Sequence, residues 1–325
     1  EFRRVLFRSS LREEDLAVVL LSGGASALLS LPPAGVKIEE KQKLTRALLS
    51  TGAPIADINC VRRHLSCIKG GRLADAIYPA RSITLAISDV AGNDPSVIAS
   101  GPTVPAHTTA LDALSIIERF RVPIAEPIIE CFKQNLALPA PDAPCFDRAT
   151  FRIIATGSHA LSAAAALARE AGCEVSIVGD ELEASALELA TSHARMARSH
   201  TNPGVPRIIL SGGEATVALG KTHGAGGPNQ EFALALALEL QGERNVHALA
   251  CDTDGIDGGS GAASDPAGAV ISSRTLSRAK RLGLDAEMAL AGHDAGTFFQ
   301  TLGDLITTGP TLTNVNDFRA ILVSA

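Results

Sequence analysis

The sequence predicts an α/β protein of two domains. Short apolar runs recur along its 325 residues, and each but the last leads through a polar or glycine-rich turn towards a segment of helical composition. Strand, turn and helix in this order are typical of βα units packed in layers. A chain of this length exceeds one common domain core, which favours two domains over a single large one.

The expected strands are continuous apolar runs that end in polar turns. This pattern is typical of strands buried on both faces of a parallel sheet. They are expected at residues 16–21, 83–87, 151–155, 175–178, 207–210, 246–250 and 304–306. The clearest helices are residues 158–171, which are rich in alanine and closed by Gly172, and residues 230–240.

Two proline-rich stretches interrupt this alternation, because proline fixes φ and removes a backbone donor. Residues 136–144 predict a surface loop inside the first domain, and residues 199–206 predict a linker between domains. The boundary is therefore expected near residue 203. The expected division is residues 1–10 as an artefact or disordered segment, 11–203 as the first domain and 204–325 as the second.

Composition and charge exclude several classes of protein. The formal net charge is −6 with acids and bases interspersed, which offers no basic patch to nucleic acid or to an anionic membrane. Six cysteines without a CxxC pair or zinc spacing favour reduced thiols. No apolar stretch approaches the roughly 18 residues that span a bilayer, and the opening residues do not read as a signal peptide. We expect a cytoplasmic protein that acts on a diffusible small molecule.

Residues 22–26 (SGGAS) directly follow the first expected strand. At the carboxyl end of a parallel strand, such a turn exposes backbone N–H groups to a phosphate or carboxylate. The turn is neither a Walker loop nor a dinucleotide-binding fingerprint. Most Gly-Gly turns only reverse the chain, and this remains the alternative.

Residues 59–72 concentrate basic side chains, with Asn59 and Ser66 as neutral donors. On a helix, Arg62, Ser66 and Lys69 would share one face and present two cations to an anion. A solvated basic face is the alternative interpretation.

The loop at residues 88–103 contains Asp89 and Asp94 at the end of an expected strand. Mg²⁺ takes one or two carboxylates beside water and substrate phosphates, so these residues are candidate metal ligands. Helix capping by the same aspartates is the alternative.

The second half repeats this arrangement. Residues 211–214 follow a strand with two glycines, residues 221–231 form a glycine-rich loop that opens onto a helix, and residues 252–261 supply three aspartates. The last segment lacks the glutamate and flanking helices of an EF-hand, which excludes that calcium site. Residues 309–319 predict a polar turn.

Taken together, these segments resemble the glycerate 2-kinase family, whose C-terminal half is the MOFRL domain and whose members are often labelled hydroxypyruvate reductase. The resemblance covers nearly the whole chain after Leu11. It rests on LLSGGASALL at 20–29, INCVRRHLSCIKGGRLA at 58–74, ISDVAGNDPSVIASGPTV at 87–104, LSGGEATV at 210–217, GGPNQEFALA at 226–235, DTDGIDG at 252–258 and TGPTLTNVNDFRAIL at 308–322.

The resemblance implies a three-layer α/β/α, Rossmann-like N-terminal domain, a smaller α/β MOFRL domain, and a site in the cleft between them that uses ATP and Mg²⁺. The implied site residues fall into three groups. They are Arg62 and Lys69 as catalytic cations; Ser22, Gly23, Gly24, Ser26, Asn59, Ser100, Gly101, Gly212, Gly213, Glu214, Gly226, Gly227, Asn229 and Gln230 for substrate or nucleotide; and Asp89, Asp94 and Asp254 for the metal.

The implied reaction is ATP-dependent phosphorylation of D-glycerate to 2-phosphoglycerate. Members of the family extend upstream and carry there a lysine taken as catalytic, and many have arginine at the positions of Ala225 or Pro228 and aspartate at that of Asn93. We therefore expect little or no kinase activity from this chain alone. The alternatives are an NAD(P)H-dependent hydroxypyruvate reductase, disfavoured by the missing dinucleotide fingerprint, and a catalytically silent fragment of the kinase. A homodimer is left open.

Overall fold

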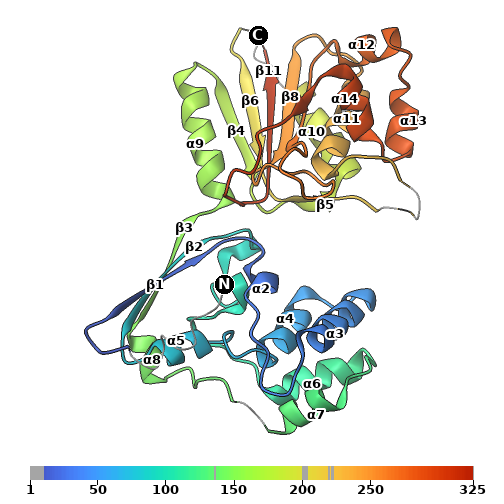
Figure 1. The fold of residues 1–325 in the computed structure, drawn as a ribbon. Coiled ribbons are helices and arrows are strands. Elements are labelled where there is room, and N and C mark those ends of the chain that lie inside the picture. The colour runs from blue at the N-terminus through green and yellow to red at the C-terminus, as the bar shows by residue number, and fades with distance from the viewer. Residues whose placement is uncertain (1–10, 135–136, 200–203, 219, 221–222, 325) are drawn as a thin grey trace. The chain divides into compact units, whose positions relative to one another are not determined.

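A computed structural model describes residues 11–134, 137–199, 204–218, 220 and 223–324, and the chain divides into two compact units (Figure 1). Unit 1 ends at Ile154 and unit 2 begins at Ala155. The division falls earlier than residue 203, where the linker was expected, because residues 155–199 pack with the sheet of unit 2. Of the expected linker, residues 200–203 lie outside the described residues.

Unit 1 combines a small sheet with a group of helices. Its elements are β1 (Leu16–Leu21), α2 (Ala25–Leu28), α3 (Ile38–Ser50), α4 (Ile55–His64), α5 (Arg72–Ile77), β2 (Arg81–Ile87), the 3₁₀ turns η1 (Ala91–Asn93) and η2 (Ile98–Ser100), α6 (Ala110–Arg119), α7 (Glu126–Lys133), α8 (Pro144–Asp147) and β3 (Ala149–Ala155).

The sheet of unit 1 has the strand order β1-β2-β3, with β1 and β2 parallel. One face packs Leu21 and Ala86 against the η2 turn. On β1 the alternate side chains Leu16, Val18 and Leu20 are 48%, 60% and 73% exposed. The prediction that β1 is buried on both faces is therefore wrong for this structure, in which one face of the strand stays exposed.

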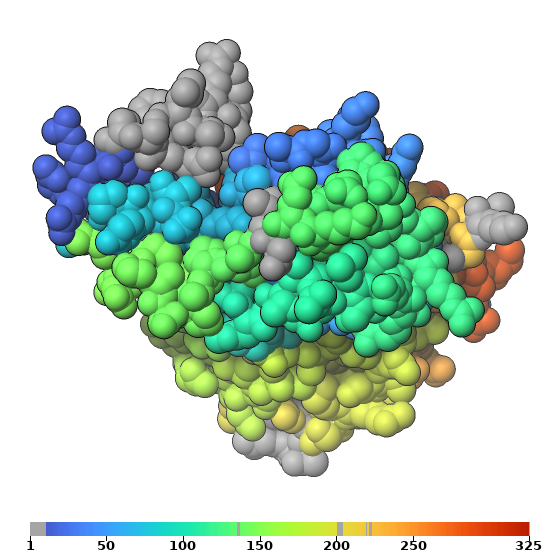
Figure 2. Space-filling model, turned by 90° about the horizontal axis from the view of Figure 1, so that it is seen from below, coloured from blue at the N-terminus to red at the C-terminus, as the bar shows by residue number. Residues whose placement is uncertain are grey.

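The helices of unit 1 enclose their own core. Leu44 and Leu48 of α3 pack with Ile58 of α4 and with Ile116 and Ile117 of α6. Helix α6 begins with a capping box in which Thr109 accepts from the Asp112 N–H and the Asp112 carboxylate accepts from the Thr109 N–H. Helices α6 and α7 lie side by side on the surface of this unit (Figures 1 and 2).

Unit 2 is built on a six-stranded mixed sheet. Its elements are α9 (Gly157–Glu170), β4 (Glu174–Gly179), β5 (Glu183–Ser185), α10 (Ala186–Arg198), β6 (Arg207–Ser211), β7 (Glu214–Thr216), α11 (Pro228–Leu240), β8 (Val246–Asp252), β9 (Gly268–Ile271), α12 (Thr275–Arg281), α13 (Ala286–Ala291), α14 (Ala295–Leu302), β10 (Leu305–Ile306) and β11 (Asp317–Val323).

The large sheet has the order β10-β9-β8-β11-β6-β4, and β5 pairs separately with β7. Strands β4 and β6 are parallel, whereas β11 is antiparallel to both β6 and β8. Residues 317–319 therefore belong to a central strand, although they were expected in a polar turn. The purely parallel sheet predicted from sequence is corrected to a mixed one.

Helices cover the large sheet on both faces (Figure 1). Helix α9 packs Leu161 and Ala165 on Leu210 of β6, and α10, α11 and α14 form the larger core on the other face. Helix α11 is buried along most of its length, including Phe232, Leu234 and Leu236. The three layers expected in the first domain are thus seen in unit 2. No helix in the described part of the chain is long and apolar enough to cross a membrane.

Candidate active site

The basic segment of unit 1 lies on the end of a helix and the turn that follows it. Helix α4 ends at His64, so Ser66 and Lys69 do not share a helix face with Arg62, and that prediction is wrong. The Ser66 hydroxyl accepts from the N–H groups of Ile68 and Lys69, each at 3.3 Å. A serine bonded to its own following backbone competes with a continuing helix, and the chain turns here instead.

Two arginines of this segment hold loops together. Arg63 donates from Nη1 to the Thr108 hydroxyl at 3.1 Å and from Nη2 to the Ser96 carbonyl oxygen at 3.0 Å. Arg72 donates from Nη1 to the carbonyl oxygen of Ser66 at 2.6 Å. These two cations have a structural role that is sufficient to explain them.

Arg62 and Lys69 lie beside several of the polar residues predicted to form the site in unit 1. Arg62 donates from Nη2 to the Ser26 carbonyl oxygen at 2.7 Å and from Nη1 to Asn59 Oδ1 at 3.5 Å. The hydroxyls of Ser26 and Ser100 lie 3.2 Å apart. Lys69 Nζ donates to the Ala99 carbonyl oxygen at 3.3 Å. The structure therefore brings together Ser26, Asn59, Arg62, Lys69 and Ser100, from segments far apart in the sequence.

The loop beside Lys69 is held in an unusual backbone conformation. Ala99 and Ser100 have φ of 53° and 63°, a region that costs energy for residues with a side chain. The N–H groups of Gly70 and Gly71 donate to the carbonyl oxygens of Ser100 and Gly101 at 3.1 and 2.8 Å. Gly71 must be glycine, because a Cβ there would lie 2.5 Å from the Phe146 ring. The strained loop is thus fixed by the turn that carries Lys69.

Lys41 is a third cation at this place, and the sequence analysis missed it. It lies on the buried face of α3 with Leu44 and Leu48, and only 5% of it is exposed. Its Nζ has no hydrogen-bond partner among the described residues. The signal in the sequence is the i, i+3, i+7 spacing, which puts a lysine where an apolar residue is expected. Lys41, Arg62 and Lys69 together are called the cation triad below.

The members of the cation triad act on one another electrostatically. Burial, followed by the charges of Lys41, Arg62 and Arg63, lowers the pKa of Lys69 to about 7. Burial and the charge of Arg62 lower the pKa of Lys41 to about 8. Taking a charge out of water is costly unless an opposite charge compensates it. This arrangement favours an anion.

The glycine turn after β1 contributes less than expected. Ser22, Gly23 and Gly24 lead into α2, which has only four residues, and Gly24 takes the left-handed conformation that starts it, with φ of 76°. A helix this short has little dipole to offer an anion. Of this turn, the structure joins only Ser26 to the cation triad.

The acidic loop after β2 has one half-buried and one exposed aspartate. Burial raises the pKa of Asp89. Asp94 Oδ1 accepts from the Ser96 N–H at 2.8 Å, as a turn-forming aspartate does. Gly101 follows with φ of 62°, and it bonds the turn of Lys69 as described above.

In unit 2, the N-terminus of α11 is occupied by a protein carboxylate. Asp257 Oδ1 accepts from the Asn229 N–H at 2.9 Å, and Oδ2 accepts from the Gln230 N–H at 2.8 Å. The side-chain amides of Asn229 and Gln230 donate to the same carboxylate. Gly227, before the helix, must lack a side chain because a Cβ would lie 2.2 Å from the Asp257 carbonyl oxygen. The donors predicted to bind a nucleotide here therefore serve Asp257.

A second buried network begins at β11, which the sequence analysis missed. Arg319 is fully buried, donates to the Asp317 carboxylate, and donates from Nη1 to the Gly212 carbonyl oxygen at 3.0 Å. Asp317 Oδ2 accepts from the Ala215 N–H at 2.7 Å. Gly213 has φ of 96° and no room for a Cβ beside Leu182. The turn at 212–214, predicted to bind substrate, is packed into this network.

Glu214 and Gly226 are the remaining residues of unit 2 that were predicted to bind substrate or nucleotide. Glu214 begins the short strand β7 and pairs with Glu183 of β5. Gly226, with φ of 132°, packs against the backbone of Gly296. Both positions have roles in the fold of unit 2.

The third predicted metal ligand, Asp254, belongs to unit 2, whereas Asp89 and Asp94 belong to unit 1. Asp254 Oδ1 accepts from the Ile256 N–H at 2.8 Å. Burial and the charges of Asp254 and Asp317 raise the pKa of the neighbouring Asp252. In the described residues, no three His, Cys, Asp or Glu side chains are arranged to hold a metal ion.

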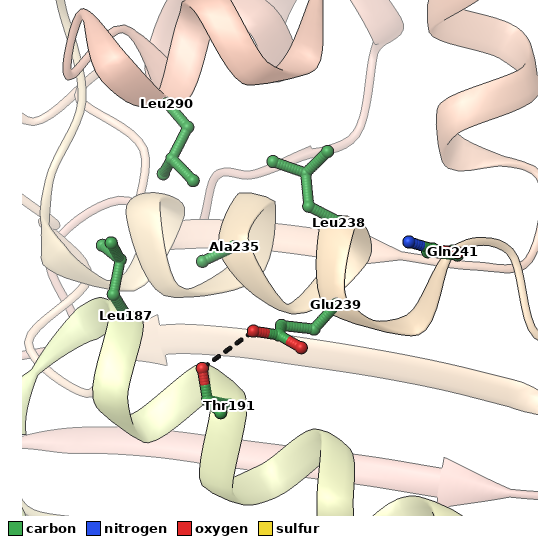
Figure 3. Close-up of a pocket in the computed structure, with 7 residues that line it drawn as sticks. All are labelled: Leu187, Thr191, Ala235, Leu238, Glu239, Gln241 and Leu290. Carbon is green, nitrogen blue, oxygen red and sulfur yellow. Dashed lines mark hydrogen bonds between the residues drawn. The ribbon is translucent and has the colours of Figure 1, made fainter.

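A pocket of about 320 Å³ lies between α10, α11 and α13 (Figure 3). Its one carboxylate, Glu239, accepts from the Thr191 hydroxyl at 2.9 Å, and no cation lines it. Leu187, Leu238 and Leu290 supply most of its apolar lining. This lining does not suit a small anion.

Comparison with known proteins agrees with the resemblance seen in the sequence. The family described as a domain of unknown function (DUF4147) matches residues 3–133, and the MOFRL family matches residues 207–317. A protein of Agrobacterium vitis named "Putative hydroxypyruvate reductase" is 46% identical over 95% of this chain and 70% of its own length. The D-glycerate 2-kinase of Thermotoga maritima is 37% identical over 97% of this chain and 74% of its own length.

Solved structures give the same result. The crystal structure of the glycerate kinase of Thermotoga maritima matches 98% of this chain and 75% of that chain, with a TM-score of 0.88 at 35% identity. A Pyrococcus horikoshii protein matches with a TM-score of 0.81 at 33% identity. The chain therefore belongs to the glycerate 2-kinase family, in which a DUF4147 domain is joined to a C-terminal MOFRL domain.

Proposed function

We propose that the protein catalyses ATP-dependent phosphorylation of D-glycerate to 2-phosphoglycerate. The observation that carries this proposal is the cation triad. Among the described residues, Arg62 and Lys69 bond only uncharged acceptors, and Lys41 Nζ has no hydrogen-bond partner. A site of this kind suits a substrate and a transition state that are both anionic. The relatives named as glycerate kinases supply the identity of the substrate.

In this reaction the C2 hydroxyl of glycerate attacks the terminal phosphorus of ATP in line, and ADP leaves. The protein contributes mainly positioning and charge stabilisation. Arg62 and Lys69 would bind the glycerate carboxylate or the transferring phosphoryl group. Because they are fixed by the Ser26 and Ala99 carbonyl oxygens before substrate arrives, little reorganisation is needed during the reaction.

Bound Mg²⁺ would neutralise phosphate charge. Asp89, Asp94 or Asp254 would hold it, since Mg²⁺ needs only one or two carboxylates when water and phosphate oxygens complete its shell. Each offers carboxylate oxygen at the end of a strand or in a turn of the described structure. Their chemistry fits the ion, and among the described residues no group of three or more such side chains is arranged around one point.

Paired assays test the proposal against hydroxypyruvate reduction. Because the Thermotoga relative is longer than this chain, both the 325-residue chain and a form extended with N-terminal residues of that relative are assayed. The expected result for the extended chain is ADP formation that depends on D-glycerate. NADH or NADPH oxidation that depends on hydroxypyruvate, without ADP formation, would overturn the proposal in favour of a reductase.

A further inference from the structure

The cation triad has an excess of positive charge that no carboxylate among the described residues balances. Arg62 bonds the Ser26 carbonyl and the Asn59 amide oxygen, Lys69 bonds the Ala99 carbonyl, and Lys41 bonds nothing among the described residues. All these acceptors are uncharged. No ion pair in the described part of the chain includes a member of the cation triad.

A purely structural role explains Lys41 poorly. It occupies the buried face of α3, where a methionine or leucine would pack equally well without an amine to desolvate. Its nitrogen is buried, and none of the residues that the structure describes accepts a hydrogen bond from it. A buried amine without an acceptor is costly, so the presence of Lys41 at this place points to an acceptor other than the described residues.

We propose that Lys41 completes, with Arg62 and Lys69, an oxyanion site for the phosphorylated hydroxy acid, which holds the phosphate and carboxylate of the product together. The identity of this ligand rests on the proposed function. Glycerate carries one negative charge, whereas a phosphate ester carries about −1.5 to −2 at neutral pH, to which the carboxylate adds one. Three cations match the product better than the substrate.

Anion binding at this site is coupled to proton uptake. The groups that act on Lys69 are Lys41, Arg62 and Arg63, and those that act on Lys41 are Arg62 and Cys67. Burial and neighbouring cations hold the pKa of Lys69 near 7 and that of Lys41 near 8. A bound anion favours their charged forms, so at pH 8 the ligand draws protons onto the lysines.

The test is isothermal titration calorimetry on the 325-residue and extended chains, in two buffers of different ionisation enthalpy at pH 8. The probes are D-glycerate, inorganic phosphate and 2-phospho-D-glycerate. The variants are Lys41→Met, Lys41→Arg, which keeps the charge, and Lys43→Met as the matched control, because Lys43 is an exposed lysine on the same helix. Thermal unfolding checks that each variant is folded.

We expect the wild type to bind 2-phospho-D-glycerate more tightly than phosphate, and phosphate more tightly than glycerate, with net proton uptake. Lys41→Met should weaken binding of 2-phospho-D-glycerate about 10- to 100-fold, the effect of losing one charge-assisted contact. Lys41→Arg should retain most of the affinity, and Lys43→Met all of it. Equal affinity in Lys41→Met and Lys43→Met, or no preference for the phosphorylated acid, overturns the inference.

The results separate this inference from the proposed function. Tight, Lys41-dependent binding in an extended chain that forms no ADP would keep the anion site and remove the kinase. Glycerate-dependent ADP formation with unaltered binding by Lys41→Met would keep the kinase and remove Lys41 from its site.

Discussion

The basic side chains of residues 62–72 divide by what they contact. Arg63 and Arg72 bond carbonyl and hydroxyl oxygens of neighbouring loops. His64 lies against the Thr108 hydroxyl, and burial with the charges of two arginines lowers its pKa to about 4, so it is neutral at physiological pH. Arg62 and Lys69 remain as cations beside Ser26 and Ser100. Residue type alone could not separate these roles, because the separation depends on partners remote in sequence.

Arg62→Ala and Lys69→Met should lower kcat/KM for glycerate phosphorylation in the extended chain by about 10- to 100-fold each, as expected for loss of a charge-assisted contact of about 1.5–3 kcal/mol. The control is Arg46→Ala, an exposed arginine on α3. Steady-state kinetics measure the effect, and urea unfolding checks the fold. If both variants match Arg46→Ala in kcat/KM, Arg62 and Lys69 have a structural role and not a catalytic one.

The pH dependence of stability should report the buried lysines. In the ligand-free protein Lys69 has a pKa of about 7, against an ordinary value of 10.5. Between these values the unfolded chain binds more protons than the folded one, so the free energy of unfolding rises with pH over this window. Lys69→Met should flatten that rise, as measured by urea unfolding at several pH values. A variant with the same slope as the wild type would show that Lys69 is not desolvated.

At the scale of elements, the apolar runs predicted strands well because burial and strand formation share one signal. All seven expected strands overlap strands of the structure. Strand β11 was missed because its first residues, Asp317 and Arg319, are polar. They are buried through each other, through partners at 212–215 and 229, and, for Arg319, over the Phe232 ring. Lys41 was missed for a similar reason. The sequence alone does not show whether a charged side chain is buried or exposed, because that depends on its neighbours in the fold.

Asp257 should be a strong determinant of stability in unit 2. It is 2% exposed, burial raises its pKa to about 6, and it accepts four hydrogen bonds from Asn229 and Gln230. Asp257→Ala would leave several buried donors without an acceptor, at about 1–3 kcal/mol each, so we expect a loss of at least about 3 kcal/mol in urea unfolding.

The matched comparison is Asp285→Ala. Asp285 is an exposed aspartate that caps α13 by accepting from the Met288 N–H at 2.9 Å. Loss of an exposed cap costs about 1 kcal/mol. Equal losses in the two variants would mean that Asp257 acts as an ordinary cap.

At the scale of the molecule, the candidate residues are distributed over two units of different character. Unit 1 carries the cation triad, whereas in unit 2 Asn229 and Gln230 donate to Asp257, and Asn229 also donates to Asp317. Unit 1 also exposes Leu16, Val18 and Leu20 on one face of β1, an apolar surface of the kind that favours association.

Activity should require a divalent cation, because Mg²⁺ neutralises phosphate charge in phosphoryl transfer from ATP. Asp89→Asn or Asp254→Asn should raise the Mg²⁺ concentration for half-maximal rate by about tenfold, which corresponds to about 1.4 kcal/mol of metal binding. Asp142→Asn, an exposed aspartate away from these loops in sequence, is the control. Titration of the extended chain with Mg²⁺ measures the shift, and an unchanged requirement in both variants would favour turn formation as the role of these residues.

We propose that this chain transfers a phosphoryl group from ATP to glycerate with the help of the cation triad. ³¹P NMR of the extended chain with ATP, Mg²⁺ and D-glycerate tests it most directly, because it identifies both the reaction and the phosphorylated position. We expect the 2-phosphoglycerate signal to grow as the γ-phosphate signal of ATP declines, and both changes to be slowed strongly in Lys69→Met. A spectrum with no phosphoglycerate, or one in which Lys69→Met forms 2-phosphoglycerate as fast as the wild type, would contradict it.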